Sequence, residues 1–153
     1  MQEDIRGKEH GLSSLSTDNV EAARASNVVV LALLGDADFS RALEGKLIIF
    51  KVAGVGISEI VEILSRTTHT EQRHHIARVI PSIGAQIGES MSLLAAATLS
   101  TDDQNLVSWL FKLVGRTLQV PESLLATATA VSAACHALTV VAAGALVDGS
   151  VAE

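Results

Sequence analysis

Tyrosine is absent from this chain of 153 residues, and aromatic residues account for only 3% of it. Cysteine occurs once, which excludes an internal disulfide and favours a reducing compartment. Positive charge is also scarce: the net charge is −6, and no basic run is available to neutralise nucleic-acid phosphates. The acidic, polar start lacks the basic and then apolar order of a secretory signal. We therefore expect a soluble cytoplasmic protein that binds no nucleic acid.

Aliphatic residues supply what the aromatic residues do not, because 48% of the chain is hydrophobic. A core of Ala, Val, Leu and Ile suits parallel strands covered by helices. Strand-like and helix-like segments alternate, with strands expected at 27–34, 46–52, up to Ile80, 91–97 and 116–120. This order predicts an α/β fold: a reduced Rossmann-like, mostly parallel sheet followed by a long apolar C-terminal helix. We expect residues 1–17 to be poorly ordered, 18–120 to form the α/β domain, and 121–153 to form the helix and tail.

Local patterns set the bounds of several helices. A short helix is expected at 36–43, and the apolar spacing of Ile57, Ile60, Val61 and Leu64 predicts an amphipathic helix at 57–65. The residues from Thr101 to Gln104 form a possible capping box for the next helix. Gly115 is expected to end that helix as a left-handed cap.

The segment from Leu124 to Val147 contains no charged residue and is long enough to span a bilayer. Threonine, serine and histidine side chains dilute it, and no basic residues flank it. A helix that is apolar on all sides belongs either in a membrane or in a protein core. We favour a buried helix at a homodimer interface, with no membrane span.

Several short segments of the sequence resemble the pyrroline-5-carboxylate reductase family. The resemblance covers about four fifths of the chain as scattered matches. It is carried by Asn27–Ala32, Lys46–Ile49, Ala53–Val55, Arg78–Pro81, Gly88–Glu89, Met91, Leu110–Phe111, Val114–Arg116, Ala130–Ser132, Ala137 and Ala145–Leu146. The resemblance implies a reductase ancestry, and it places the family's long dimerisation helix at the apolar C-terminal segment.

The departures from the family pattern lie where the family does its chemistry. The residues before Asn27 contain no strand followed by Gly-x-Gly-x-x-Gly, and the only Gly-x-Gly is Gly54-Val55-Gly56, with Glu59 at the third glycine position. Ser82-Ile83-Gly84 replaces the family's Asn-Thr-Pro at the nicotinamide end. Residues 133–136 replace Gly-Ser-Gly-Pro at the mouth of the substrate pocket, and the chain stops before the family's carboxylate-binding region. We therefore expect no cofactor on the isolated chain.

His136 is the most suggestive candidate for a catalytic role. It lies one helical turn after Ser132 and next to Cys135 on an otherwise apolar helix, where burial would keep the imidazole neutral. Such an imidazole could be a general acid or base, with Ser132 beside it, or a core histidine bonded to a backbone carbonyl. Cys135 is a candidate substrate contact or a small buried hydrophobe.

Two carboxylates and one turn complete the set of candidate site residues. Asp36 follows the first strand, where α/β sheets bind ligands, although helix capping is the more frequent role of an aspartate at such a position. Glu89 lies beyond the turn that contains Ser82 and Ile83, both candidate substrate contacts, and could reach the same crevice or remain solvated. Lys51 and Arg78 are interpreted as strand-end charges. The histidines at 69, 74 and 75 do not form a plausible metal site, because adjacent strand residues point to opposite faces.

Three functional hypotheses follow. The first is a cofactor-independent enzyme that cyclises or isomerises a small, apolar or cyclic-imine-like biosynthetic intermediate in a dimer pocket, with a specialised-metabolite pathway as one setting. The second is an NADPH-dependent imine reductase that needs a partner chain for its nucleotide-binding half. The third is a non-catalytic dimeric module that stabilises a pathway partner.

Overall fold

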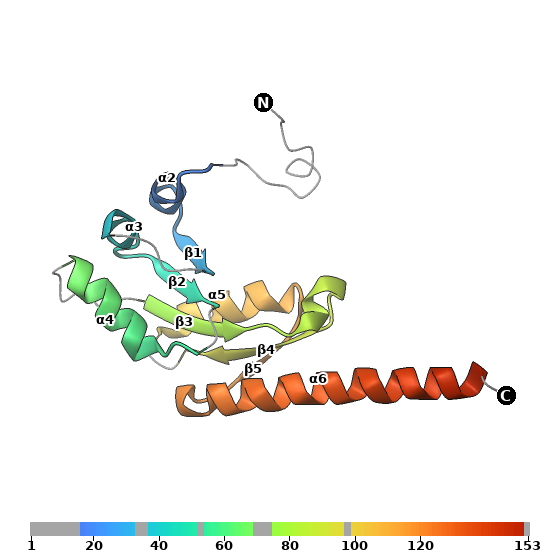
Figure 1. Ribbon diagram of the computed structural model, residues 1–153. Coiled ribbons are helices and arrows are strands. Elements are labelled where there is room, and N and C mark those ends of the chain that lie inside the picture. The colour runs from blue at the N-terminus through green and yellow to red at the C-terminus, as the bar shows by residue number, and fades with distance from the viewer. Residues whose placement is uncertain (1–15, 33–36, 52–53, 69–74, 97–98, 152–153) are drawn as a thin grey trace.

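The computed structural model describes residues 16–32, 37–51, 54–68, 75–96 and 99–151, and its elements form an α/β arrangement (Figure 1). Five strands form one sheet in the order β1-β2-β3-β4-β5. The elements in chain order are α2 (Asn19–Arg24), β1 (Val28–Leu31), α3 (Ala37–Ala42), β2 (Leu47–Phe50), α4 (Ile57–Thr68), β3 (His75–Ile80), η1 (Ile83–Ile87), β4 (Ser90–Ala95), α5 (Thr101–Lys112), β5 (Gly115–Gln119) and α6 (Glu122–Val151).

Strand direction confirms the expected mostly parallel sheet. β1 pairs with β2, β2 with β3 and β4 with β5 in parallel, and only β3 and β4 are antiparallel. The antiparallel pair follows from the short connection through η1, because parallel neighbours need a long crossover. The fold is the Rossmann-like α/β layer with a long C-terminal helix that the sequence predicts.

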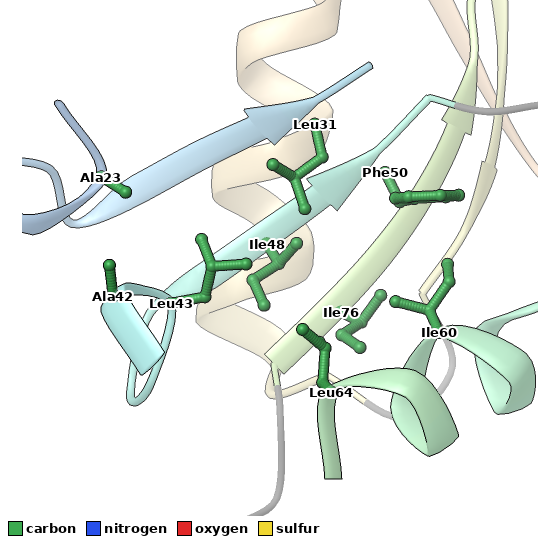
Figure 2. Packing of buried hydrophobic residues seen from close by; sticks show 9 residues of the cluster. All are labelled: Ala23, Leu31, Ala42, Leu43, Ile48, Phe50, Ile60, Leu64 and Ile76. Carbon is green, nitrogen blue, oxygen red and sulfur yellow. The ribbon is translucent and has the colours of Figure 1, made fainter. Parts of the chain in front are cut away.

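Side chains alternate between the two faces of the sheet and build a core on each face. On β2, Ile48 and Phe50 pack with Ile60 and Leu64 of α4 in the cluster that Figure 2 shows. The other two residues of β2, Leu47 and Ile49, belong to a second cluster with Val107 of α5. Because all four residues of β2 are buried, this strand reads as the continuous apolar run typical of a sheet covered on both faces.

The first turns of α6 pack on β4, and the remainder of the helix extends beyond the sheet (Figure 1). Leu125 is fully buried against Leu93 and Ala95. Beyond Ser132, however, every described residue of α6 is exposed in the single chain, so burial of this part of the helix would require a second chain. The 30-residue helix, whose most apolar stretch of 18 residues has a mean hydropathy of 1.9, also has the length and composition of a membrane span, which is weak evidence by itself.

Two local details differ from the sequence expectation. Ser100, not Thr101, caps α5: its hydroxyl oxygen accepts a hydrogen bond from Asp103 N, and Gln104 Nε2 donates to Leu99 O. Gly115 does not cap α5, because the helix ends through Leu113 in right-handed conformation and Gly115 begins β5. Its φ of 144° brings the backbone against Ser90, where an added Cβ would lie 2.2 Å from Ser90 O.

Candidate active site

A groove of about 300 Å³ lies between α6 and the part of the sheet where β3 turns through η1 into β4. Its walls come from three separate stretches of sequence. The residues that line it are Ile80, Pro81, Ser82, Ile83, Met91, Leu93, Thr129, Ser132, Ala133 and His136. The groove therefore brings together four of the predicted site residues: Ser82, Ile83, Ser132 and His136.

The helix side of the groove carries its polar groups. Thr129, Ser132 and His136 share one face of α6 because they are spaced by three and four residues. Thr129 Oγ1 donates to Leu125 O at 2.7 Å, so that hydroxyl hydrogen is already used. Within the described chain, the side chains of Ser132 and His136 make no hydrogen bond. They are the polar groups of this wall that are free to meet a ligand.

The position of His136 corrects one expectation. The side chain is exposed in the single chain, not enclosed by apolar neighbours as the sequence suggested. The physical reason is the course of α6, which leaves the sheet after its first turns and therefore brings no second wall over the imidazole. His136 is a groove residue open to solvent.

The opposite wall is held in place by serine hydroxyls. Ser82 N donates to Ser90 Oγ at 3.1 Å, and Met91 N donates to Ser82 Oγ at 3.0 Å. Ser90 Oγ also lies 3.0 Å from the buried Ser92 Oγ. Ser82 thus ties η1 to β4, while its neighbour Ile83 is 74% exposed at the mouth of the groove.

The remaining candidates do not join the groove. Cys135 is exposed, not buried as expected, and it is not a lining residue, because it is on another face of α6. Glu89 is exposed and also outside the lining, so the geometry gives it no contact there. Asp36 lies outside the described residues.

Sequence reasoning missed a buried charge cluster that fixes α6. Arg78, expected to be a simple strand-end charge, is only 5% exposed, and its Nη1 donates to Glu122 Oε1 at 2.9 Å. The same oxygen accepts a hydrogen bond from Ile57 N at 3.2 Å. We call these three groups the Glu122 bridge; it joins β3, α4 and α6. The sequence feature that could have indicated this contact is Arg78 itself, a single arginine inside the apolar run of β3.

The described residues do not fit a metal or a dinucleotide. They contain no cluster of His, Cys, Asp and Glu that could hold a metal ion. His75 instead pairs with a carboxylate, since its Nδ1 lies 2.9 Å from Asp103 Oδ2. Gly54 and Gly56 precede α4, but the carboxylate of Glu122 already occupies the N–H of Ile57 at the start of that helix. A phosphate would meet a negative charge there instead of free donors.

No family model matches the sequence. Among curated proteins, the chain is 32% identical over 143 residues to a pyrroline-5-carboxylate reductase of Schizosaccharomyces pombe, a match that covers 88% of this chain and 49% of that protein.

Solved structures agree on the fold. A Plasmodium falciparum pyrroline carboxylate reductase with NADP bound has a TM-score of 0.71 at 22% identity, covering 91% of this chain and 56% of the other. A Myxococcus stipitatus imine reductase in complex with NADP+ has a TM-score of 0.58 at 16% identity, covering 94% and 53% respectively. The chain is therefore a relative of the pyrroline-5-carboxylate reductases, and it spans about half the length of the curated relatives it matches.

Proposed function

We propose that this chain supplies the imine-binding side of a reductase site. The observation that carries the proposal is the groove, which combines an apolar floor with the free side chains of Ser132 and His136. Its volume of about 300 Å³ suits a small ring. The names of the relatives support the ligand class, because they are reductases of pyrroline-5-carboxylate and of imines.

The chain's own residues would bind the ring and handle its proton. Ile80, Met91 and Leu93 provide apolar surface for the ring carbons. A hydrogen bond or proton from His136 or Ser132 to the imine nitrogen makes the neighbouring carbon more electrophilic. The reducing equivalent in this proposal is a reduced nicotinamide dinucleotide bound outside the described residues, since these residues do not fit it.

A second candidate function needs no nucleotide. It is the isomerisation of a cyclic imine, in which a proton leaves the carbon beside the C=N bond and another reaches the nitrogen, giving the enamine. The observation in its favour is at the start of α4, the helix that follows Gly54 and Gly56. There the carboxylate of Glu122 already accepts the hydrogen bond from Ile57 N, which a phosphate of a nucleotide would otherwise accept. The comparisons name reductases, so this candidate stands second.

Ligand binding is tested by titrating the unsubstituted cyclic imine pyrroline into the protein and following backbone amide signals by NMR. We expect shifts at Ile80, Ser82, Ile83 and residues 129–136. Ala133→Leu fills the groove and should abolish them, whereas Ala134→Leu, on the same helix but outside the lining, should not. Unchanged signals at saturating pyrroline would contradict the proposal.

The two candidate reactions are separated in deuterated buffer. An isomerase incorporates deuterium beside the C=N bond faster than buffer alone and without NADPH, and His136→Ala should slow it by about a hundredfold. The reductive proposal expects no such exchange. NADPH should not stabilise the isolated chain, although a bound ligand at a hundred times its dissociation constant adds about 2.7 kcal/mol.

We also propose that the protein forms a homodimer in the cytoplasm through Leu124–Val147. Large aliphatic side chains point outward along this helix, and water is an unfavourable surrounding for them. They include Val131, Leu138, Val140, Val141, Leu146 and Val147, each between 57% and 76% exposed. Light scattering should give a dimer for the wild type and a monomer for Leu138→Glu, with Leu113→Glu, at the exposed C-cap of α5, as the control. A dimer that survives Leu138→Glu would contradict the interface.

A further inference from the structure

The groove beside α6 carries no acidic side chain and no lysine or arginine. Among the described residues, those that line it include no Asp, Glu, Lys or Arg. Most of its polar side chains, those of Thr129, Ser132 and His136, belong to α6. The opposite wall contributes only one polar side chain, that of Ser82. The groove therefore has one polar wall and one wall that is mainly apolar.

Two arginines lie on the face of the sheet that α6 covers, but neither serves the groove. Arg78 Nη1 donates to Glu122 Oε1 at 2.9 Å, so its charge is already paired. Arg116 is opposite Met91 in the neighbouring strand β5, but it is not a lining residue. Backbone donors are also in use, because the N–H groups of Ser82 and Met91 donate to serine hydroxyls. A carboxylate in the groove would therefore meet hydroxyl groups but no lysine or arginine.

The open part of the groove is apolar. Ile83 and Met91 line it and are 74% and 40% exposed, whereas Leu93, which packs against Leu125 of α6, is 5% exposed. A ring whose nitrogen meets the α6 wall directs a substituent on the neighbouring carbon along the groove, toward either Leu93 or Ile83. Because Leu93 is buried, the room for that substituent lies at Ile83 and Met91.

We infer that the groove selects cyclic imines with an uncharged, apolar substituent beside the ring nitrogen, and that Ile83 is the specificity-determining residue. This inference rests on the proposed function, because it assigns the substituent of the ring that the groove is proposed to bind. A methyl group against Ile83 gains apolar contact, which corresponds to about tenfold in affinity. A carboxylate at the same place loses water without gaining a cation. The inferred ligand therefore differs from the carboxylate-bearing ring for which the curated relatives are named.

The experiment compares two rings that differ only in this substituent, 5-methylpyrroline and pyrroline-5-carboxylate. Each is titrated into the full chain at pH 8, where an ordinary imidazole is uncharged, and the dissociation constant is obtained from the backbone amide shifts. For the wild type, we expect 5-methylpyrroline to bind at least about tenfold more tightly than the carboxylate.

Two lysine substitutions in η1 test the role of Ile83. Ile83→Lys replaces the apolar contact by an ammonium group that can pair with the carboxylate, so the preference for the methyl ring should fall by about tenfold. Ile87→Lys is the matched control, because Ile87 is 79% exposed on the same short helix and outside the lining. This variant carries the same added charge and should keep the preference within about twofold of the wild-type value.

Three results would overturn the inference. One is a wild-type protein that binds the two rings equally or prefers the carboxylate. Another is a preference that Ile83→Lys leaves unchanged. The third is an equal loss of preference in the two lysine variants, which would mean that net charge decides and not the position of the side chain. Failure of the proposed function looks different, because unsubstituted pyrroline would then leave the amide signals unchanged, whereas failure of this inference alone leaves pyrroline bound.

Discussion

Glu122 Oε1 and Arg78 Nη1 lie 2.9 Å apart and join the first turn of α6 to the third strand of the sheet. The arginine side chain is 6% exposed and the glutamate side chain 35% exposed. Arg78 Nε and Glu122 Oε2 are buried without partners in the described chain, so the one bonded oxygen carries the contact. Since α6 forms one wall of the groove, this pair helps to set the position of Ser132 and His136.

Removing the glutamate should destabilise the protein strongly. Glu122→Ala leaves the Arg78 guanidinium buried and unpaired, which costs about 3 kcal/mol or more. Glu122→Gln keeps an oxygen that can accept from both Arg78 and Ile57 N, so we expect a loss of about 1–2 kcal/mol. Urea unfolding measures both values. The control Glu59→Gln, at an exposed site on α4, should stay within about 0.5 kcal/mol, and equal losses for Ala and Gln at 122 would refute the argument.

Gly115 should not tolerate a side chain. An alanine Cβ would lie 2.2 Å from Ser90 O and would need a φ of 144°, so β5 would have to move from β4. We expect Gly115→Ala to lower the free energy of unfolding by about 2–4 kcal/mol. Gly149→Ala is the matched control, because nothing lies within 4 Å of an added Cβ at this position of α6, which is outside the proposed dimer interface. That change should be neutral or stabilising by up to about 1 kcal/mol in thermal or urea unfolding. A mild effect at 115 would show that the strands rearrange easily.

The identity of the α5 cap can be tested by a pair of adjacent substitutions. Ser100 Oγ accepts from Asp103 N at 3.1 Å, and Thr101 is the exposed first residue of the helix. Ser100→Ala should therefore cost about 1 kcal/mol in urea unfolding. Thr101→Ala should change the stability by less than about 0.5 kcal/mol. The reverse order would restore the capping box that the sequence suggested.

Local patterns were sufficient to predict most elements but not the contacts between them. The spacing of Ile57, Ile60, Val61 and Leu64 predicted α4, because apolar residues three and four positions apart lie on one face of a helix. The cap of α5 was misplaced by one residue, since serine and threonine at neighbouring positions offer the same hydroxyl. Gly115 was misinterpreted because glycine serves both helix ends and close strand approaches, and only the position of Ser90 decides between them.

The groove was predicted in part for a similar reason. The resemblance to the reductase family directed attention to Ser82, Ile83, Ser132 and His136, which the fold brings together. Met91 and Leu93 were missed, because an apolar residue in a strand carries no sign of which cavity it faces. The partner of Arg78 lies 44 residues away in sequence, and no local spacing connects the two. The exposure of His136 depends on where α6 leaves the sheet, which is a tertiary property.

The contact between His75 and Asp103 should make stability depend on pH at the acidic end. Hydrogen bonds from His75 and Ser100 lower the pKa of Asp103 below its usual value of 3.8. A carboxylate with a depressed folded-state pKa contributes stability that is present above the unfolded pKa and is lost as the pH falls through the folded pKa. The free energy of unfolding of the wild type should therefore exceed that of Asp103→Asn near pH 6, with the difference shrinking below pH 3.8. Asp102→Asn, at an exposed position of the same turn, should show no such convergence; a constant difference between wild type and Asp103→Asn from pH 6 to pH 3 would mean that the charge of Asp103 does not matter.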